Sequence, residues 1–211
     1  MLSPLGDSAI MVRFGLVLDD GANRDAIRFA QAVSADPVSG VVEVVPSLVS
    51  VLVRYDARAI SFDRLRGELT LRIGRQPDEE RCSLWTMDID FGGEAGPDLN
   101  EAAESLGMNS AAFIARHNRE PLRVLTTGFA PGFVYCGFHG EDMVLPRRQT
   151  VRASVPAGSI LFAAGQTAVT ATDLPTGWHV IGSTDFRNFD ASREPPTQLR
   201  AGDRVQFRTV R

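Results

Sequence analysis

The most distinctive part of this chain is the stretch G-F-A-P-G-F-V-Y-C-G-F, residues 128–138. Its glycines and its proline argue against regular secondary structure, and its aromatic side chains are unusual for a solvated loop. It follows an apolar stretch that has the pattern of a β-strand. A loop of this kind typically lines a pocket or docks on a partner.

On both sides of this loop the sequence has the pattern of a β-rich domain. From Pro121 onward, short strand patterns are separated by glycine and proline about every ten residues, which predicts a closed or nearly closed β-barrel. Upstream, Leu84–Phe91 has a strand pattern. Asp98, with Glu101 three residues later, has the spacing of a capping box at a helix start. A further helix is expected over Ser110–His117.

The first part of the chain alternates strand and helix signals in the order β-α-β-β-α. Strands are expected over Ser8–Phe14, Val41–Val45 and Leu48–Tyr55, with one helix from Asp19 to about Ala35 and another beginning after Ser61. This order is the start of a ferredoxin-like, split βαβ unit. The charged stretch Gly74–Arg81 has the composition of a linker. We therefore expect an α+β protein with a ferredoxin-like domain at residues 1–80 and a β-barrel domain at residues 81–211.

Charge and composition exclude several classes of protein. The 211 residues include 26 acidic and 22 basic side chains, a formal net charge of -4, which argues against a nucleic-acid partner. No secretion signal or bilayer-spanning run is visible, so we expect a cytoplasmic protein without a membrane partner. Cys82 and Cys136 lack the spacing of a disulfide framework or a structural zinc site, and both are expected to be free thiols.

Every basic residue of the chain is arginine, and lysine is absent. A phosphate-binding loop lysine, a Schiff-base lysine and a lysine general base are therefore excluded. The Ser-Ser-Lys triad of amidase-type hydrolases is excluded for the same reason. If ATP is consumed, the chain must bind it in another way or leave it to a partner.

Residues 128–138 resemble the G-F-x-P-G-F-x-Y-L-G signature of the allophanate hydrolase subunit 1 family, which includes the B subunit of 5-oxoprolinase and a sporulation kinase inhibitor. The resemblance continues in order and at family spacing on both sides. The matching segments are Gly6–Ala9, Val41–Asp56, Gly92–Glu94, Gly96–Leu99, Leu145–Arg148, Val155–Ser159, Gly165–Thr167, Gly177–Trp178 and Gly202–Val205. Nearly the whole chain is covered.

The resemblance implies a ferredoxin-like domain followed by a cyclophilin-like barrel. It also implies a share in opening or carboxylating a small amide. The implied partner is an allophanate hydrolase subunit 2-like chain, similar to the C subunit of 5-oxoprolinase, and a protein similar to the A subunit joins the two in the ATP-dependent 5-oxoprolinase. Similar sequences form part of the carboxyltransferase of urea carboxylase, and the residues leave open whether biotin takes part.

Two residues are candidates for catalysis, and each has a plain structural alternative. His117 could move protons near neutral pH, or it could interact with the dipole at the end of its helix. Gln166, with Thr167 beside it, could orient a substrate amide or carboxylate, or the pair could close a hairpin. His139 and His179 lack metal-ligand spacing with His117, so no metal site is expected.

The remaining candidates are substrate-binding residues around the aromatic loop. Phe129, Phe133 and Tyr135 could wall a pocket with a phenolic hydroxyl, or they could be core aromatics at a subunit interface. Arg147 could bind an anion through two hydrogen bonds, although adjacent arginines such as Arg147 and Arg148 are more often a solvated surface pair. Trp178 is most simply a barrel-core residue.

These observations favour the small subunit of an amide-processing enzyme. The reaction that the resemblance implies is ATP-dependent 5-oxoproline cleavage to glutamate, or that of an allophanate hydrolase or urea carboxylase-like complex. The barrel would contribute Gln166, His117 and the aromatic loop to a composite site. The alternative is a regulatory protein that binds and inhibits a sensor histidine kinase. Prolyl isomerase activity does not follow from a cyclophilin-like fold.

Overall fold

The computed structural model describes residues 1–75 and 82–210. The chain divides into two compact units, Met1–Arg81 and Cys82–Arg211. Most of the predicted linker, Gly74–Arg81, and the boundary predicted after residue 80 lie outside the described residues. No helix of the described ranges is both long and apolar enough to cross a membrane.

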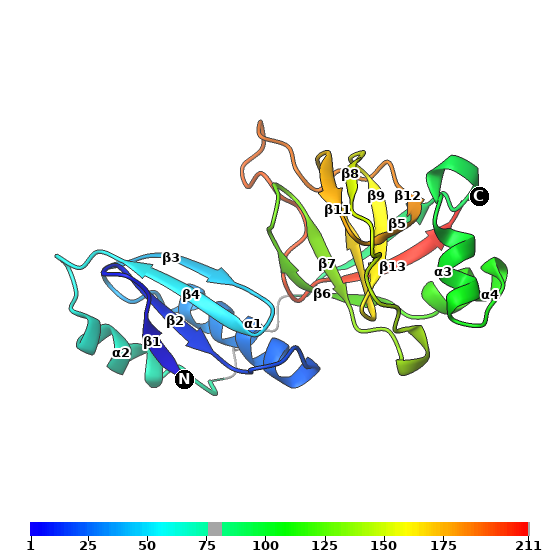
Figure 1. Ribbon diagram of the computed structural model, residues 1–211. Helices are drawn as coiled ribbons and strands as arrows, with labels where there is room; N and C mark the ends of the chain where they lie inside the picture. Colours follow the sequence, from blue (N-terminus) through cyan, green and yellow to red (C-terminus); the bar gives the residue numbers. More distant parts are fainter. Residues whose placement is uncertain (76–81, 211) are drawn as a thin grey trace. The chain divides into compact units, whose positions relative to one another are not determined.

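The first unit is a four-stranded antiparallel sheet with two helices packed on one face (Figure 1). The strand order is β1-β2-β4-β3. Its elements are β1 (Leu2–Pro4), β2 (Ala9–Arg13), α1 (Asp20–Ala35), β3 (Val41–Pro46), β4 (Ser50–Tyr55) and α2 (Phe62–Thr70). Phe29 and Val33 of α1 and Leu65 and Leu69 of α2 are buried with alternate residues of the strands. One face of the sheet therefore holds the apolar core of this unit.

Side-chain caps start both helices where the sequence predicted. The carboxylate of Asp19 accepts from Ala22 N (2.9 Å), and the hydroxyl of Ser61 accepts from Arg64 N (3.4 Å). The predicted β-α-β-β-α order is present, but a further strand, β1, precedes it. A ferredoxin-like unit takes its fourth strand after the second helix, whereas here the N-terminal β1 lies beside β2. The ferredoxin-like assignment therefore remains a prediction.

The second unit is built on a seven-stranded sheet in the order β12-β9-β10-β7-β6-β13-β5. Its helices are η1 (Gly93–Ala95), α3 (Leu99–Ser105), α4 (Ser110–His117) and η2 (Glu141–Met143). The strands of the large sheet are β5 (Leu84–Ile89), β6 (Leu122–Thr127), β7 (Val134–Gly137), β9 (Ser159–Ala163), β10 (Gln166–Val169), β12 (His179–Ser183) and β13 (Arg204–Thr209). A separate two-stranded sheet pairs β8 (Arg152–Val155) with β11 (Leu174–Thr176).

The large sheet curls until its two edge strands approach each other. Backbone hydrogen bonds run in both directions between Asp90 and Ser183, each 2.9 Å long, beyond the end of β5 and at the end of β12. The strand-rich, curled second unit agrees with the barrel predicted from the glycine and proline spacing. The cyclophilin-like assignment itself stays a prediction.

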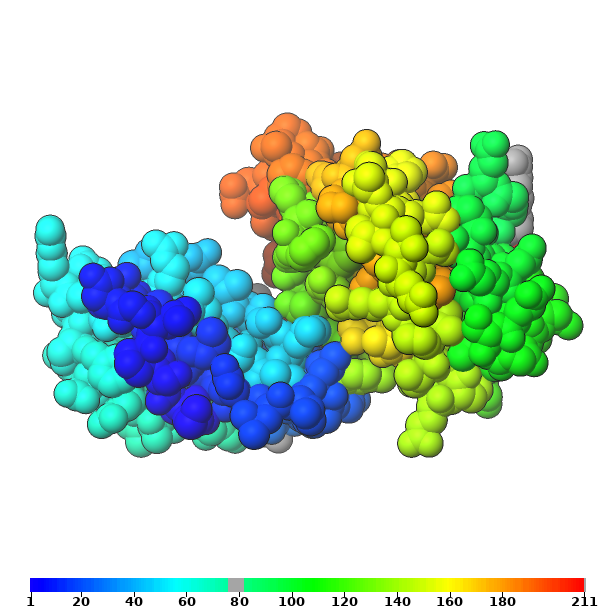
Figure 2. Space-filling view, in the orientation of Figure 1, coloured from blue at the N-terminus to red at the C-terminus, as the bar shows by residue number. Residues whose placement is uncertain are grey.

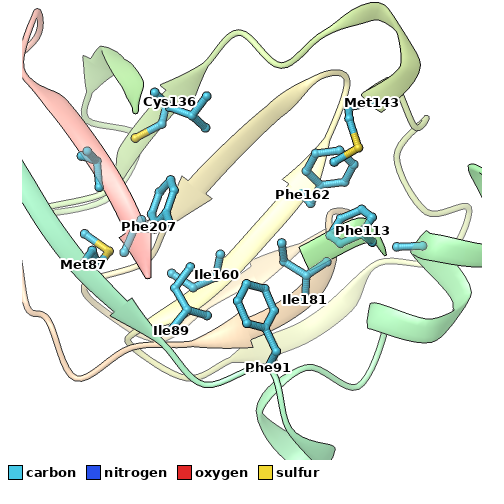
Figure 3. Close-up of a cluster of buried hydrophobic side chains, with 14 of the residues drawn as sticks. Met87, Ile89, Phe91, Phe113, Cys136, Met143, Ile160, Phe162, Ile181 and Phe207 are labelled. Carbon is cyan, nitrogen blue, oxygen red and sulfur yellow. The ribbon is translucent and has the colours of Figure 1, made fainter. Parts of the chain in front are cut away.

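Strand alternation gives this sheet two buried faces. The inner face holds Met87, Ile89, Cys136, Ile160, Phe162, Ile181 and Phe207, together with Phe113 of α4 (Figure 3). The outer face carries Leu161, Ala163, Ala168 and Val180, which pack with Val155 of β8 and Leu174 of β11. Because neighbouring residues of a strand point to opposite faces, consecutive side chains of β10 belong to two different clusters.

The capping box predicted at Asp98 and Glu101 is not formed. Asp98 precedes α3, but its side chain makes no capping hydrogen bond. Its carboxylate instead accepts hydrogen bonds from Arg148 Nη1 (2.8 Å), from Val180 N (2.9 Å) and from Arg152. This buried carboxylate therefore joins the start of α3 to β8 and β12, and Arg148 is its partner rather than a free surface side chain.

The prediction that residues 128–138 lack regular structure is wrong for their second half, which forms β7 (Val134–Gly137) because β6 and β10 supply its hydrogen-bonding partners. The first part is a loop, and close packing explains one of its glycines. Gly132 has φ of +70°, and a Cβ added there would lie 2.5 Å from Phe189 Cβ and 2.8 Å from Ala171 Cβ. Asn188 Nδ2 also donates to Gly132 O (3.1 Å). In Figure 2 the yellow-green loop of residues 128–132 and the orange segment that follows Phe189 lie side by side.

We expect Gly132→Ala to lower the free energy of unfolding of this unit by about 3 kcal/mol, since steric overlap adds to the strain of positive φ. Gly107→Ala is the matched control, because Gly107 also has φ of +70° but no atom within 4 Å of the added Cβ. Its cost should be about 1 kcal/mol. Urea unfolding followed by tryptophan fluorescence measures both, since both tryptophans lie in this unit. Equal losses would contradict the packing argument.

Candidate functional site

His117 is buried at the end of α4, with only 1% of its surface exposed. The helix begins at Asn109, whose side chain accepts from Ala112 N (2.8 Å). Phe113 and His117 are four residues apart and lie on the buried side of the helix. The imidazole is therefore placed among the aromatic side chains of the inner cluster, within ring-contact distance of Phe91, Phe113, Phe162 and Phe207.

A chain of hydrogen bonds joins His117 to two residues far from it in sequence. Its Nε2 lies 2.8 Å from Thr167 Oγ1, and the same hydroxyl lies 2.8 Å from His139 Nε2. On the other side of the ring, Nδ1 lies 2.7 Å from Asn118 Oδ1. We call His117, Thr167 and His139 the imidazole relay.

Burial keeps both imidazoles of the relay neutral near neutral pH. Burial lowers the pKa of His117 to about 4, and the hydrogen bond with Asn118 opposes this only in part. Burial also lowers the pKa of His139 to about 3, and repulsion from His117, once that ring is protonated, and from Arg116 lowers it further. A neutral His117 is not the cation that would interact favourably with a helix dipole. A pKa of about 4 also lies well below the neutral range in which proton transfer by this residue was predicted.

The relay and its surroundings offer no hydroxyl or thiol that a substrate could reach. Thr167 Oγ1 touches both imidazoles, but its residue has no exposed surface. Cys136, directly across the strand pair from Thr167, is also fully buried, and burial raises the pKa of its thiol to about 12. A thiol in that state is neither ionised nor reachable near neutral pH.

The structure places Gln166 and His117 on opposite faces of the sheet. Thr167 and Val169 of β10 point to the inner cluster, so Gln166 and Ala168 point to the outer one. Gln166 is 6% exposed, and its Oε1 is buried without a hydrogen-bond partner in the described part of the chain. The pair predicted to act together is therefore separated by the sheet itself.

The predicted substrate-binding residues form a chain of aromatic contacts on that outer side. Phe129 contacts Phe133 (5.5 Å between ring centroids), Phe133 contacts Tyr135 (4.7 Å), and Tyr135 contacts Trp178 (5.9 Å). The guanidinium of Arg147 lies over the Trp178 ring at 5.8 Å. Trp178 is buried in the outer cluster, not among the inner-face side chains of the curled sheet.

Phe129 differs from its aromatic neighbours in its exposure. Its surface is 75% exposed, and its φ of +86° is unusual for a residue other than glycine. Hydrogen bonds from Gly128 N to Phe133 O (3.0 Å) and from Phe133 N to Ala130 O (3.1 Å) hold the loop in this shape. The loop thus presents an aromatic ring to solvent on a strained backbone.

His139 is the residue of this site that the sequence did not single out. It follows β7, and its backbone N donates to Gly165 O (2.9 Å) in the turn before β10. The relay joins α4, β10 and the turn after β7, across sequence separations of 50 and 28 residues. The only signal in the sequence for its role was its position directly after residues 128–138. Its spacing to the other histidines was judged only against metal-ligand patterns, which it does not match.

Comparisons with known proteins agree along nearly the whole chain. A family model described as carboxyltransferase domain, subdomain C and D, matches residues 1–199. The protein named as the B subunit of 5-oxoprolinase in Bacillus subtilis (strain 168) is 32% identical over 218 residues, covering 98% of this chain and 91% of that protein. The match therefore runs through both units.

Two solved structures extend the comparison to the fold. The crystal structure of TTHA0988 superposes with a TM-score of 0.84 at 32% identity, covering 100% of this chain but only 40% of that one. The urea carboxylase of Kluyveromyces lactis superposes with a TM-score of 0.75, covering 100% of this chain and 22% of that one. At 16% identity, this second likeness concerns the fold alone.

Proposed function

Because this chain belongs to the carboxyltransferase subdomain C and D family, as residues 128–138 predicted, we propose that it is one subunit of a 5-oxoprolinase-like enzyme complex. The observation that carries the proposal is the match to a protein named as a subunit, over 98% of this chain and 91% of that protein. The proposed reaction is the ATP-dependent opening of a small cyclic amide, 5-oxoproline, to glutamate.

The chemistry of the chain supports a shared active site. Hydrolysis through a covalent intermediate on a hydroxyl or thiol needs that group activated and within reach of the substrate. Here the only hydroxyl of the imidazole relay is that of the buried Thr167, and Cys136 is a buried thiol. We therefore assign the nucleophile or activated intermediate to a subunit 2-like partner, similar to the C subunit of 5-oxoprolinase, with a protein similar to the A subunit as the third component.

We assign ATP to the partner proteins as well. The chain has no lysine, and the glycine-containing loop that begins at Gly128 does not suit a phosphate group. In that loop Gly128 N already donates to Phe133 O, and Phe129 occupies the exposed position. Phosphate-binding loops instead direct free backbone N–H groups at the ligand.

Reconstitution tests the proposal directly. The chain is purified alone and together with its two proposed partner proteins, and glutamate release from 5-oxoproline is measured with and without ATP. We expect release only from the mixture and only with ATP. Glutamate release by the lone chain would overturn the shared site. A mixture that is inactive on 5-oxoproline, while the lone chain captures a sensor histidine kinase, would support the regulatory alternative.

Phe129 supplies a prediction about assembly of this complex. Its exposed ring on a strained, hydrogen-bonded loop suits a partner contact better than a role in the lone chain. We expect Phe129→Ala to weaken binding of the subunit 2-like partner about tenfold or more, as loss of an interface aromatic typically costs over 1 kcal/mol. Titration calorimetry measures this binding.

The control for this variant is Leu16→Ala, which truncates another exposed apolar side chain, 87% exposed, in the first unit. It should leave the partner affinity unchanged, and neither variant should change the free energy of unfolding by more than about 0.5 kcal/mol. If the Phe129→Ala protein binds the partner with wild-type affinity, the aromatic loop is not part of the interface.

A further inference from the structure

A cavity of about 360 Å³ lies between the end of α4 and the turn after β7. Its wall includes Arg116, His117, Arg119, Glu120, His139 and Met143. The charges at its wall are compensated, since Arg116 forms two hydrogen bonds with Asp142 (2.7 and 2.8 Å) and Arg119 lies 3.8 Å from Glu120. A small neutral ligand, or one with a single weak charge, suits such a cavity better than a polyanion.

The hydrogen-bond partners determine which nitrogen of each imidazole carries the proton. Asn118 Nδ2 donates to Thr209 Oγ1 (3.0 Å), so Asn118 Oδ1 is the atom that faces His117. Because this oxygen can only accept, Nδ1 of a neutral His117 carries the proton and Nε2 is a bare acceptor. Thr167 has one hydroxyl hydrogen, which it donates to that Nε2. His139 must then donate its Nε2–H to Thr167 Oγ1.

This ordering leaves Nδ1 of His139 as an unused acceptor. The residue is partly exposed and lines the cavity, and within residues 1–75 and 82–210 the one hydrogen bond of its ring is that between Nε2 and Thr167. His117 and Thr167 act as positioning residues, because together they hold the His139 ring in one tautomer and one orientation. The relay therefore maintains a fixed acceptor at the cavity wall.

We propose that this cavity binds a small amide or lactam whose N–H group donates a hydrogen bond to Nδ1 of His139. The bare imidazole nitrogen requires a donor, and the compensated wall favours a ligand with little net charge. A volume of about 360 Å³ admits a molecule of a few heavy atoms with its hydrating water. The choice of an amide among possible N–H donors rests on the proposed function.

The tautomers are tested first, on the full-length wild-type chain. Long-range ¹H–¹⁵N correlation spectra of the histidine side chains at neutral pH distinguish protonated from bare ring nitrogens. We expect His117 protonated at Nδ1 and His139 protonated at Nε2. A His139 protonated at Nδ1 would have no acceptor to offer, and the proposal would fail.

The ligand class is tested next with a matched pair of probes. 2-Pyrrolidone carries a lactam N–H, and N-methyl-2-pyrrolidone has the same ring and carbonyl without that hydrogen. We expect 2-pyrrolidone to shift the Nδ1 resonance of His139 and to bind about tenfold more tightly than its methylated form, the effect of one buried hydrogen bond. Equal affinities, or shifts confined to residues outside the cavity, would overturn the proposal.

Variants of Thr167 test whether the relay sets up the acceptor. Thr167→Val removes the hydroxyl while keeping the branched shape, so His139 should populate both tautomers and 2-pyrrolidone should lose its preference over the methylated probe. Thr167→Ser keeps the hydroxyl and should restore a single tautomer and the preference. If the Thr167→Val protein retains the single His139 tautomer and the preference for 2-pyrrolidone, the relay has no positioning role. The wild-type spectra decide the matter if this variant does not fold.

Failure of this inference can be distinguished from failure of the proposed function. The spectra and probe affinities use the lone chain and need no catalytic activity. If the cavity binds 2-pyrrolidone but the reconstituted complex is inactive, the proposed lactam site stands and the proposed reaction is wrong. If the complex is active but lactams do not shift the His139 resonance, the proposed reaction stands and the proposed lactam site is wrong.

Discussion

Replacing Asp98 by asparagine is expected to lower the free energy of unfolding of the second unit by about 3 kcal/mol, the typical cost of removing one member of a buried ion pair. The carboxylate is 2% exposed and has three partners, Arg148, Arg152 and Val180 N. Asparagine keeps one acceptor oxygen but brings two donor hydrogens toward the guanidinium groups. Urea unfolding followed by tryptophan fluorescence measures the loss.

The matched control is Asp88→Asn. Asp88 also forms a two-bond pair, with Arg208 at 2.6 and 2.8 Å, but both side chains are largely exposed. Water replaces the lost partner there, so the cost should stay below about 1 kcal/mol. A loss for Asp98→Asn no greater than for this control would show that burial does not strengthen the Asp98 cluster.

The pKa of Asp98 agrees with its structural role. Burial would raise the pKa of this carboxyl, but hydrogen bonds from Arg152 and Val180 N and the charges of both arginines outweigh it, and the pKa lies below the ordinary value. A lowered pKa means that the native state is stabilised above the unfolded pKa of about 3.8. That stabilisation is lost as the pH falls through the lower native value.

Acidification is expected to destabilise the second unit well before its carboxylates titrate. The pKa of His117 is about 4 in the folded chain against 6.5 for an unperturbed histidine, so the unfolded chain binds a proton that the native chain does not. Stability therefore falls as the pH drops below about 6.5, and His117 alone accounts for about 3 kcal/mol by pH 4. Urea unfolding at a series of pH values measures this slope.

His117→Gln separates the imidazole from other acid effects. This variant changes the absolute stability, because packing against Phe113 and Phe207 is altered, but its slope between pH 6.5 and pH 4 should be clearly shallower. His139, whose pKa is also lowered, maintains part of the slope in both proteins. An unchanged slope would show that His117 is not a buried neutral histidine.

Local patterns predicted the elements of the first unit because each signal acts over a few residues. Asp19 and Ser61 cap the two helices, and Phe29, Val33 and Leu65 line one face. The N-terminal strand β1 was not predicted. It has only three residues, Leu2–Pro4, and it is a strand because β2 supplies its partner. No pattern within three residues carries that information.

Motifs and local patterns along the chain were sufficient to predict the family, the β-rich second unit and the residues from which a site could be built. How those residues combine depends on contacts between distant segments. Gln166 and Thr167 are adjacent in sequence, yet the alternation of β10 directs them to opposite faces. His139 joins Thr167 and His117 only because β7, β10 and α4 meet. Asp98 likewise turns from its helix to two arginines about fifty residues away, since a buried carboxylate is most stable where fixed cations surround it.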